Sequence, residues 1–492
     1  MDKITPVTTP SAEDPAEVEG NAPHGLQPGA VSLGQSIVFS VASSAPGQAT
    51  AITIAALVAA TAYSGGIAIL ITTLPMLAIA YAYHRLNMWK RDCGGSYMWV
   101  GKAINPYVGF MVGWLMLTGY LLGTVADILP IGPSVLSFLG LPPDNVVGSL
   151  ASVVVAGSLI VVTAVVGVQV TARFQVIIAC VEYVILLTFC AIGIYRVYFE
   201  QAPGTVRPSW EWLSIHGVGG QGSLVAGMLI TVYLFTGWDS ALYINEETER
   251  PERNPGLSAM ISVAVLGLFY ALLVFSLQGA APAAELQQHS SDALTFLATS
   301  LVGDGWGKFM AVAVILSVLG TTQAFLVSAA RIAFSMGSDR VLPPAFGKVH
   351  ARFKTPVFAT VVFGVFMIVA TCLYVLSSSV SGAFDVVVSI TGVLFATFYA
   401  ATGFATAVFY RRLARQSFSN LVSVGVLPVA GAAVLGWVAV RSVMDFDTSA
   451  MVSVVCVLAL GVVMLVVAVR HYRSDFFQID REAFEPESEI SG

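Results

Sequence analysis

Charged residues are scarce in this chain. Asp, Glu, Lys and Arg make up 11% of its 492 residues, whereas apolar residues make up 56% and the mean hydropathy is +0.81. An average soluble domain contains about 25% charged residues. So few charges could not cover the surface of a soluble protein of this length, which excludes that class and indicates many membrane spans. The chain also lacks a basic face, so no nucleic-acid partner is expected.

Cysteines and catalytic groupings are also lacking. The five cysteines show no paired or metal-type spacing, so we expect neither disulfides nor structural zinc. The spans contain no convergent nucleophile–base or metal set, which argues against an enzyme, and no cofactor is expected. The first 30 residues lack the apolar stretch of a signal peptide. We predict a disordered tail over residues 1–30, a transmembrane domain over 31–473 and a second polar tail over 474–492.

Long apolar segments, in contrast, recur along the chain. A helix needs about 20 apolar residues to cross the hydrocarbon core of a membrane. Twelve segments are long enough: 32–60, 64–86, 105–139, 148–169, 171–196, 222–248, 257–281, 304–336, 356–378, 384–410, 421–441 and 449–470. With the N-terminus inside, only Arg196, Arg207, Lys308 and Arg441 fall in outer loops, leaving 19 of the 23 Lys and Arg inside. We therefore predict an all-α protein of the cell (bacterial inner) membrane with both termini cytoplasmic.

Two of these spans are interrupted near their middles. In the first span Pro46, which cannot donate a backbone hydrogen bond, is followed by Gly47. In the sixth span residues 235–239 (FTGWD) again place a glycine and an acid at mid-depth. One such interruption could be an ordinary proline kink, but two that lie five spans apart are typical of an inverted-repeat transporter. We predict repeats over about 31–196 and 222–410, with two appended helices over about 421–470.

Four motifs resemble those of one transporter superfamily. CGGSYMWVGKAINPYVGFMVGW, after the second span, resembles its Gly-Gly-x-Tyr element, and TARFQ in the fifth span resembles its Ser-Ala-Arg-Phe-Asn. The longer matches are FTGWDSALYINEETERPERNPG around the sixth span and SAARIAFSMGSDRVLPPAFGKVHARFKTP after the eighth. On these motifs the chain is identified as a member of the amino acid–polyamine–organocation (APC) superfamily of permeases. The resemblance implies the LeuT-like fold, with a 5+5 inverted repeat, and transport by alternating access.

The first span departs from the pattern of this superfamily. Many members have a Gly-Ser-Gly break whose free amides hold the substrate carboxylate. Here SAPG replaces it, and Pro46 has no amide to donate. The amides of Ala45, Gly47 and Gln48 are the remaining potential donors.

Glu182 lies near the centre of the fifth span in an otherwise apolar stretch. A charge at mid-depth costs at least about 2.5 kcal/mol, so this carboxyl should be protonated, paired or in contact with water. In proton-coupled members of the superfamily a lysine can occupy this position, so their lysine mechanism does not transfer to this chain. We hypothesise that Glu182 carries the coupling proton or neutralises a cationic substrate. The alternative is a permanently protonated acid that hydrogen-bonds a neighbouring helix.

Two further intramembrane acids are candidates for the partner of a substrate amine. Asp239, in the interruption of the sixth span, could contact an amine or cap the second half-helix. Asp127 shares one helix face with Tyr120 and Thr124. In the superfamily this stretch faces the substrate, although Asp127 could equally be an acid of the outer vestibule.

The other candidate residues surround these positions. Phe235 or Trp238 could close over the substrate as an aromatic gate, or both could simply pack. The predicted substrate-binding set is Ser43, Ser44, Ala45, Gly47, Gln48, Tyr120, Thr124, Asp127, Phe235, Thr236, Gly237, Trp238 and Asp239. Thr321 and Thr322 form a polar face of the eighth helix, and Glu246, Glu247, Arg250 and Arg331 are predicted to form an inner ion-pair gate.

These observations predict a secondary active transporter. The three intramembrane acids lack an intramembrane Lys or Arg, which favours a substrate with a positive group. We predict import of a cationic or zwitterionic amino acid, coupled to protons. The alternatives are a polyamine or organic amine permease and an exchanger. A channel or a sensor fits less well, because two broken helices suit alternating access and no soluble signalling domain is present. The sequence does not indicate an oligomeric state.

Overall fold

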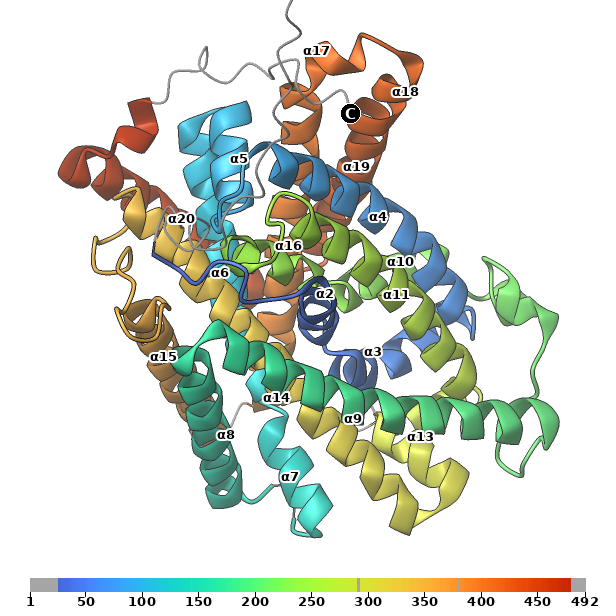
Figure 1. The fold of residues 1–492 in the computed structure, drawn as a ribbon. Helices are drawn as coiled ribbons and strands as arrows, with labels where there is room; N and C mark the ends of the chain where they lie inside the picture. Colours follow the sequence, from blue (N-terminus) through green and yellow to red (C-terminus); the bar gives the residue numbers. More distant parts are fainter. Residues whose placement is uncertain (1–24, 143, 290–292, 378–379, 479–492) are drawn as a thin grey trace, which may run out of the picture.

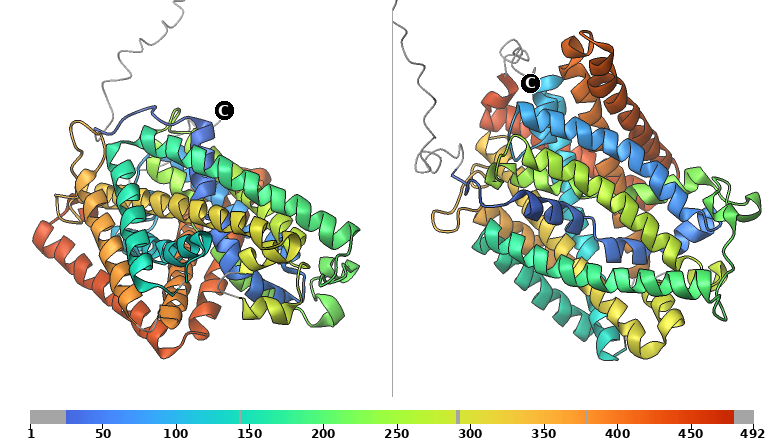
Figure 2. Two further views of the ribbon diagram at one scale, coloured as in Figure 1. Left: turned by 90° about the horizontal axis from the view of Figure 1, so that it is seen from below. Right: turned by 45° about the vertical axis from the view of Figure 1, so that its right-hand side comes forward.

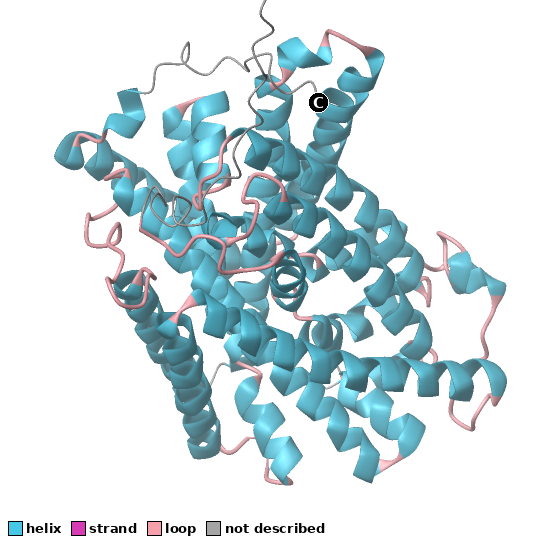
Figure 3. Ribbon diagram, in the orientation of Figure 1, coloured by secondary structure: helices cyan, strands magenta, loops and turns pink. Residues whose placement is uncertain are grey.

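The protein is an all-helical bundle in the part of the chain that its computed structural model describes, residues 25–142, 144–289, 293–377 and 380–478 (Figures 1 and 3). Twelve of its helices are long and apolar enough to cross a membrane, as predicted. They are Leu33–Thr61, Gly65–Trp89, Pro106–Leu139, Val146–Val166, Val168–Phe199, Leu224–Glu247, Asn254–Leu277, Gly305–Ser338, Val357–Leu376, Val386–Phe409, Phe418–Met444 and Thr448–Tyr472. Most of both predicted tails, residues 1–24 and 479–492, lies outside the described residues.

The individual helices are as follows. The membrane helices are α2 (Leu33–Ala42), α3 (Pro46–Thr61), α4 (Gly65–Trp89), α6 (Pro106–Ile128), α7 (Ile131–Leu139), α8 (Val146–Val166), α9 (Val168–Ile194), α10 (Leu224–Leu234), η4 (Trp238–Glu247), α11 (Asn254–Leu277), α14 (Asp304–Ser338), α15 (Val357–Leu376), α16 (Val380–Phe409), α19 (Leu427–Met444) and α20 (Thr448–Val467). The shorter ones are α5 (Ser96–Ala103), η1 (Tyr195–Phe199), η2 (Trp210–Leu213), η3 (Val218–Gly220), α12 (Ala283–Gln288), α13 (Ala293–Val302), α17 (Arg411–Ala414), α18 (Phe418–Asn420), η5 (Leu421–Val426), η6 (Ala468–Tyr472) and η7 (Asp475–Gln478).

The first span is broken, as predicted, but the break lies slightly earlier than the sequence suggested. Residues 43–45 separate α2 from α3, and Ala45 adopts the left-handed conformation with φ 47°. Pro46 is the first residue of α3. A proline suits this position because the first amide of a helix has no intrahelical partner and φ is already fixed near the helical value. Pro46 therefore begins the second half-helix and does not kink a continuous one.

The break in the sixth span brings the two interrupted helices into close contact. Residues 235–237 separate α10 from η4, which is a 3-10 helix, and Gly237 has φ 93°. The Ser43 hydroxyl donates to the Gly237 carbonyl at 2.5 Å. A Cβ atom on Gly237 would lie 2.4 Å from the Ser43 carbonyl oxygen, closer than any real contact. Only glycine satisfies both the positive φ and this approach.

Replacing Gly237 with alanine is therefore expected to disrupt the junction of the two breaks. The strained backbone and the clash with Ser43 should together lower the free energy of unfolding by about 2 kcal/mol or more. Thermal unfolding of the purified protein measures this loss. Gly392→Ala in α16 is the matched control, because its new Cβ would meet only a Tyr233 ring carbon at 3.9 Å. Equal melting temperatures for the two variants would contradict the close-approach argument.

The broken first span lies in the middle of the bundle, where its neighbours surround it (Figures 1 and 2). Helix α11 packs along α2 and α4, and α14 crosses α6 and α9. The last span lies at the edge, since in α20 only Ala450 and Gly461 are fully buried. Both described chain ends pack on one face, which we call the termini face. There the Val31 amide donates to the Glu247 carbonyl at 3.0 Å, and the Glu249 amide donates to the Val31 carbonyl at 2.9 Å.

Candidate functional site

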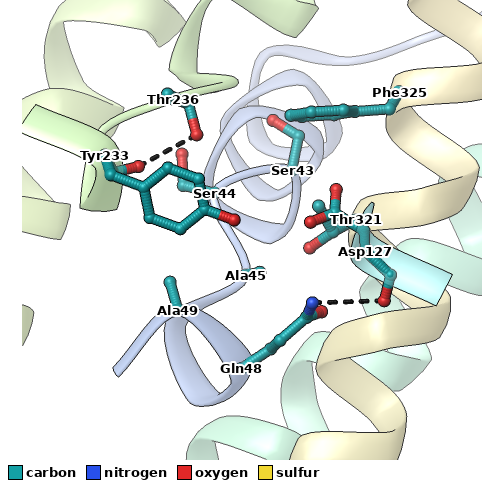
Figure 4. A pocket seen from close by; sticks show the side chains of 10 residues that line it. All are labelled: Ser43, Ser44, Ala45, Gln48, Ala49, Asp127, Tyr233, Thr236, Thr321 and Phe325. Atoms are coloured by element: carbon teal, nitrogen blue, oxygen red, sulfur yellow. Dashed lines mark hydrogen bonds between the residues drawn. The ribbon is translucent and has the colours of Figure 1, made fainter. Parts of the chain in front are cut away.

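A small cavity of about 10 Å³, room for about one water molecule, lies between the two helix breaks. Its walls come from both broken spans and from α6 and α14 (Figure 4). The lining residues are Ser43, Ser44, Ala45, Gln48, Ala49, Asp127, Tyr233, Thr236, Thr321 and Phe325. Seven of these ten were predicted, and Ala49, Tyr233 and Phe325 were not. Four elements that are far apart in the sequence thus converge on one central site.

Hydrogen-bond acceptors without partners line this cavity. Asp127 Oδ2, Gln48 Oε1 and Ser44 Oγ are buried and have no hydrogen-bond partner among the described residues. Gln48 is held in place because its Nε2 donates to the Asp127 carbonyl at 3.1 Å (Figure 4). A buried acceptor without a partner costs about 1–3 kcal/mol, and more when it is charged. The cavity is therefore suited to a ligand that brings donors and positive charge.

The first turn of α3 offers no free amide to such a ligand. The Gly47 amide donates to Glu182 Oε1 at 3.0 Å, and the Gln48 amide donates to Ser317 Oγ at 3.2 Å. The Ala45 amide donates to the Ala42 carbonyl at 3.1 Å, and the Ala49 amide to the Ala45 carbonyl. The amides that the sequence left as potential carboxylate donors all have partners within the protein.

Glu182 is one of these partners, and it lies behind the cavity, outside its lining. It extends from α9 toward the N-terminus of α3 and is 1% exposed. The ideal Cβ position of Gly47 would be 3.2 Å from its Oε1, so the helix backbone and the carboxyl are in direct contact. A helix N-terminus carries partial positive charge, which favours a carboxyl oxygen as the acceptor at this place. Glu182 is thus paired through the backbone of a broken helix.

Asp239 is enclosed by tyrosine hydroxyls. The Tyr120 hydroxyl donates to its Oδ1 at 2.8 Å and the Tyr399 hydroxyl does so at 2.6 Å, while the Tyr243 hydroxyl donates to Oδ2. Asp239 is fully buried and does not line the cavity. Because both carboxylate oxygens are satisfied, this arrangement holds η4 against α6 and α16 and leaves Asp127 as the acid that faces the cavity.

The aromatic residues are distributed differently from the prediction. Trp238 is fully buried against Tyr83 and Tyr399, with ring centroids 5.2 and 5.1 Å away, and lies outside the lining. Phe325 of α14 covers the cavity instead and packs edge-on against Tyr120. No local pattern distinguishes this residue from the other phenylalanines of the chain, of which there are 28 in all.

The other predicted residues lie around the lining. Thr236 and Thr321 line the cavity, and the Thr321 hydroxyl donates to the Ala42 carbonyl at the end of α2. Thr124 donates to the Leu121 carbonyl of its own helix. Gly47, Tyr120, Phe235, Gly237 and Thr322 are outside the lining. The polar face predicted for the eighth helix therefore contributes one of its two threonines.

A buried polar network separates the cavity from the termini face. Arg331 lies six residues beyond Phe325 on α14, about 9 Å further along the helix. Its Nε donates to Glu247 Oε2 at 2.5 Å, and both side chains are at most 1% exposed. Beside this pair the Cys93 amide donates to Glu246 Oε1 at 3.1 Å. Arg250, the fourth predicted member, is exposed.

The same region holds a grouping with metal-ligand chemistry. Asp92, Cys93 and Glu246 place one potential ligand atom each within 4.8 Å of one another. However, Asp92 Oδ1 already accepts from the Ser335 hydroxyl and the Gly94 amide, both at 2.8 Å. Burial raises the pKa of the Cys93 thiol well above its usual range, and the Glu246 carboxylate raises it further. A protonated thiol and engaged carboxylates do not favour metal binding at this grouping.

Comparisons with known proteins agree with this architecture. Residues 33–469 match the family model described as "Amino acid permease". The low-affinity putrescine importer PlaP of Escherichia coli K12 is 24% identical over 301 residues, which are 60% of this chain and 64% of the importer. The methylthioribose transporter of Bacillus subtilis is 23% identical over 303 residues, 59% of this chain and 63% of that protein. The chain thus matches less than two thirds of the length of either relative.

A solved structure shares the fold over nearly the whole chain. The crystal structure of a mutant manganese transporter from Eremococcus coleocola aligns with a TM-score of 0.58, covering 95% of this chain and 97% of that one. At 14% identity this likeness concerns the fold alone. Together with the two breaks, it confirms the predicted fold class of twelve helices with a LeuT-like arrangement.

Proposed function

The chain belongs to the amino acid permease family, and from this premise we propose that it is a secondary transporter of a small solute with a positive amino group. Asp127 is the anchor of that group in the cavity. The substrate reaches the cavity from either side of the membrane in turn, by alternating access. Import is driven by protons, with Glu182 as the proton-carrying residue. The excess of Lys and Arg in loops on one side supports cytoplasmic termini in the cell membrane.

The observation that carries this proposal is the unpaired Asp127 carboxylate oxygen beside two other buried acceptors without partners. An ammonium group has three donors and no acceptor, so it is the kind of group that suits acceptors of this type. The putrescine importer is named for a diamine and the second relative for methylthioribose, so relatives at this distance differ in substrate. The unpartnered acceptors of this cavity are therefore better evidence for the substrate than the name of either relative.

Asp127→Asn is expected to weaken binding of the amino-bearing substrate by about 100-fold, because it removes one partner of a buried charge pair. The experiment is uptake by purified protein in proteoliposomes, with labelled amino acids and amines, with and without an inward pH gradient. Concentrative uptake that a protonophore abolishes would support the proposal. Uptake only into preloaded vesicles would make the protein an exchanger.

The control for this variant is Asp144→Asn, a change of the same chemistry at an exposed position. It should leave uptake within about twofold of the unmodified protein, since exposed charges contribute little. Equal uptake by the Asp127 and Asp144 variants would remove Asp127 from the binding site. Absence of uptake for every amine and amino acid would overturn the proposed function itself.

A further inference from the structure

We infer that Glu182 is a specificity-determining residue: it is a built-in carboxylate that occupies the place of a substrate carboxylate and so restricts transport to amines without one. This inference rests on the proposed function and narrows its substrate to small diamines, polyamines and similar carboxylate-free amines. In this role Glu182 accepts a hydrogen bond from the Gly47 amide. The role in coupling is different, because there Glu182 binds and releases a proton.

The N-terminus of α3 is already occupied by side chains of the protein. A helix N-terminus binds an anion through its free amides and its partial positive charge. Here Glu182 Oε1 accepts from Gly47, and Ser317 Oγ accepts from Gln48. Pro46 contributes no amide. A carboxylate on the substrate would have to displace a buried side chain to reach any of these donors.

The rest of the cavity wall offers a substrate carboxylate few hydrogen-bond donors and no positive charge. No Lys or Arg lines the cavity among the described residues. The amide nitrogen of Gln48 and the hydroxyls of Thr236 and Thr321 donate to backbone carbonyls. The carboxylate of Asp127 would repel a second one in the same small space. The donors that are left, such as the hydroxyls of Ser44 and Tyr233, are neutral.

The role of Glu182 as a hydrogen-bond acceptor can be tested separately from its role as a proton carrier. Glutamine at position 182 retains a carbonyl oxygen for the Gly47 amide but cannot carry a proton at neutral pH. Alanine at position 182 removes the acceptor and frees the amide. The pair of variants therefore distinguishes exclusion of carboxylates from coupling, provided that binding is measured at equilibrium without a gradient.

The test uses amines and their parent amino acids, which differ only by the α-carboxylate: putrescine and ornithine, cadaverine and lysine, agmatine and arginine, tyramine and tyrosine. Equilibrium binding to the purified full-length protein gives the ratio of the two dissociation constants for each pair. The unmodified protein should bind the amine of at least one pair more tightly than its amino acid. Glu182→Ala should reduce the preference for the amine, measured as this ratio of dissociation constants, about tenfold, which is the contribution of one charge-assisted hydrogen bond. Glu182→Gln should leave the ratio within about twofold of that of the unmodified protein.

Ser317→Ala provides a second variant that does not depend on folding of the alanine variant at position 182. It frees the Gln48 amide by removing one oxygen atom, and it should narrow the ratio in the same direction. An unchanged ratio in both Glu182→Ala and Ser317→Ala would overturn the inference, as would unmodified protein that binds amino acids as tightly as amines. Either result would leave the proposed function standing. Unmodified protein that binds neither the amines nor the amino acids would overturn both.

Discussion

Replacing Glu182 with glutamine is expected to abolish accumulation driven by a pH gradient while leaving exchange across the membrane intact. The carboxyl is buried against the first amide that α3 can donate, and Ser317 binds the next one. Glutamine has nearly the same shape and can accept from Gly47, so the junction between α9 and α3 should persist. It cannot bind and release a proton. With one proton carried per substrate, a gradient of one pH unit can support about tenfold accumulation of the substrate. The Glu182→Gln variant should show no accumulation driven by the gradient.

The measurement is uptake of the identified substrate into proteoliposomes, followed with a gradient and then by counterflow with preloaded vesicles. Glu200→Gln is the matched control, because Glu200 follows the same membrane span but pairs with Arg196 at an exposed position. That variant should accumulate substrate normally. Retention of gradient-driven accumulation by Glu182→Gln would assign the proton to another residue and leave Glu182 with a structural role.

Removing Arg331 is expected to have the largest effect on stability. Its partner Glu247 would remain fully buried with no positive charge beside it, and one of its oxygens already lacks a partner. Leaving a buried charge uncompensated costs about 3–5 kcal/mol. Arg331→Ala should therefore lower the melting temperature markedly, or open the network toward the termini face. A double variant, Arg331→Met with Glu247→Leu, should recover most of the stability because it removes both charges together.

Cys93 provides a reporter that separates these two outcomes. Its thiol is buried, its pKa is raised by burial and by Glu246, and its sulfur lies 3.6 Å from the Arg331 carbonyl. A protonated, enclosed thiol reacts slowly with maleimides. In a background without the other four cysteines, Arg331→Ala should increase labelling of Cys93 about tenfold or more if the network opens in the folded protein. Unchanged labelling together with an unchanged melting temperature would show that the pair does not close this face.

The sequence predicted the spans well because their cause is local. Length and apolar composition alone decide whether a helix can cross a membrane, and all twelve lie within several residues of their predicted bounds. The break near Pro46 was also predictable, although its position depended on whether proline begins a helix or interrupts one. The interruption of the third span at residues 129–130 was missed, because Pro130 stands near one end of a long apolar run.

The contacts within the site were less predictable, because they join distant parts of the chain. The depth of Glu182 was evident from its span, but its partner Gly47 is 135 residues away. Tyr243 follows Asp239 by one helical turn and could have been suspected, whereas Tyr399 is 160 residues away. In a chain with 16 tyrosines and 28 phenylalanines, nothing local distinguishes those that meet at the centre.

The bridge between Val31 and Thr248 has a consequence for how this protein tolerates variation. Both of its hydrogen bonds join main-chain atoms, so they do not depend on which side chains these positions carry. Alanine substitutions in this region would leave these two hydrogen bonds intact, and so would most natural substitutions. Proline at position 31 or 249 is the exception, because it lacks the amide that donates in one of these two hydrogen bonds. The segment before α2 is thereby bound to the end of η4 by main-chain hydrogen bonds, which side-chain mutagenesis would not detect.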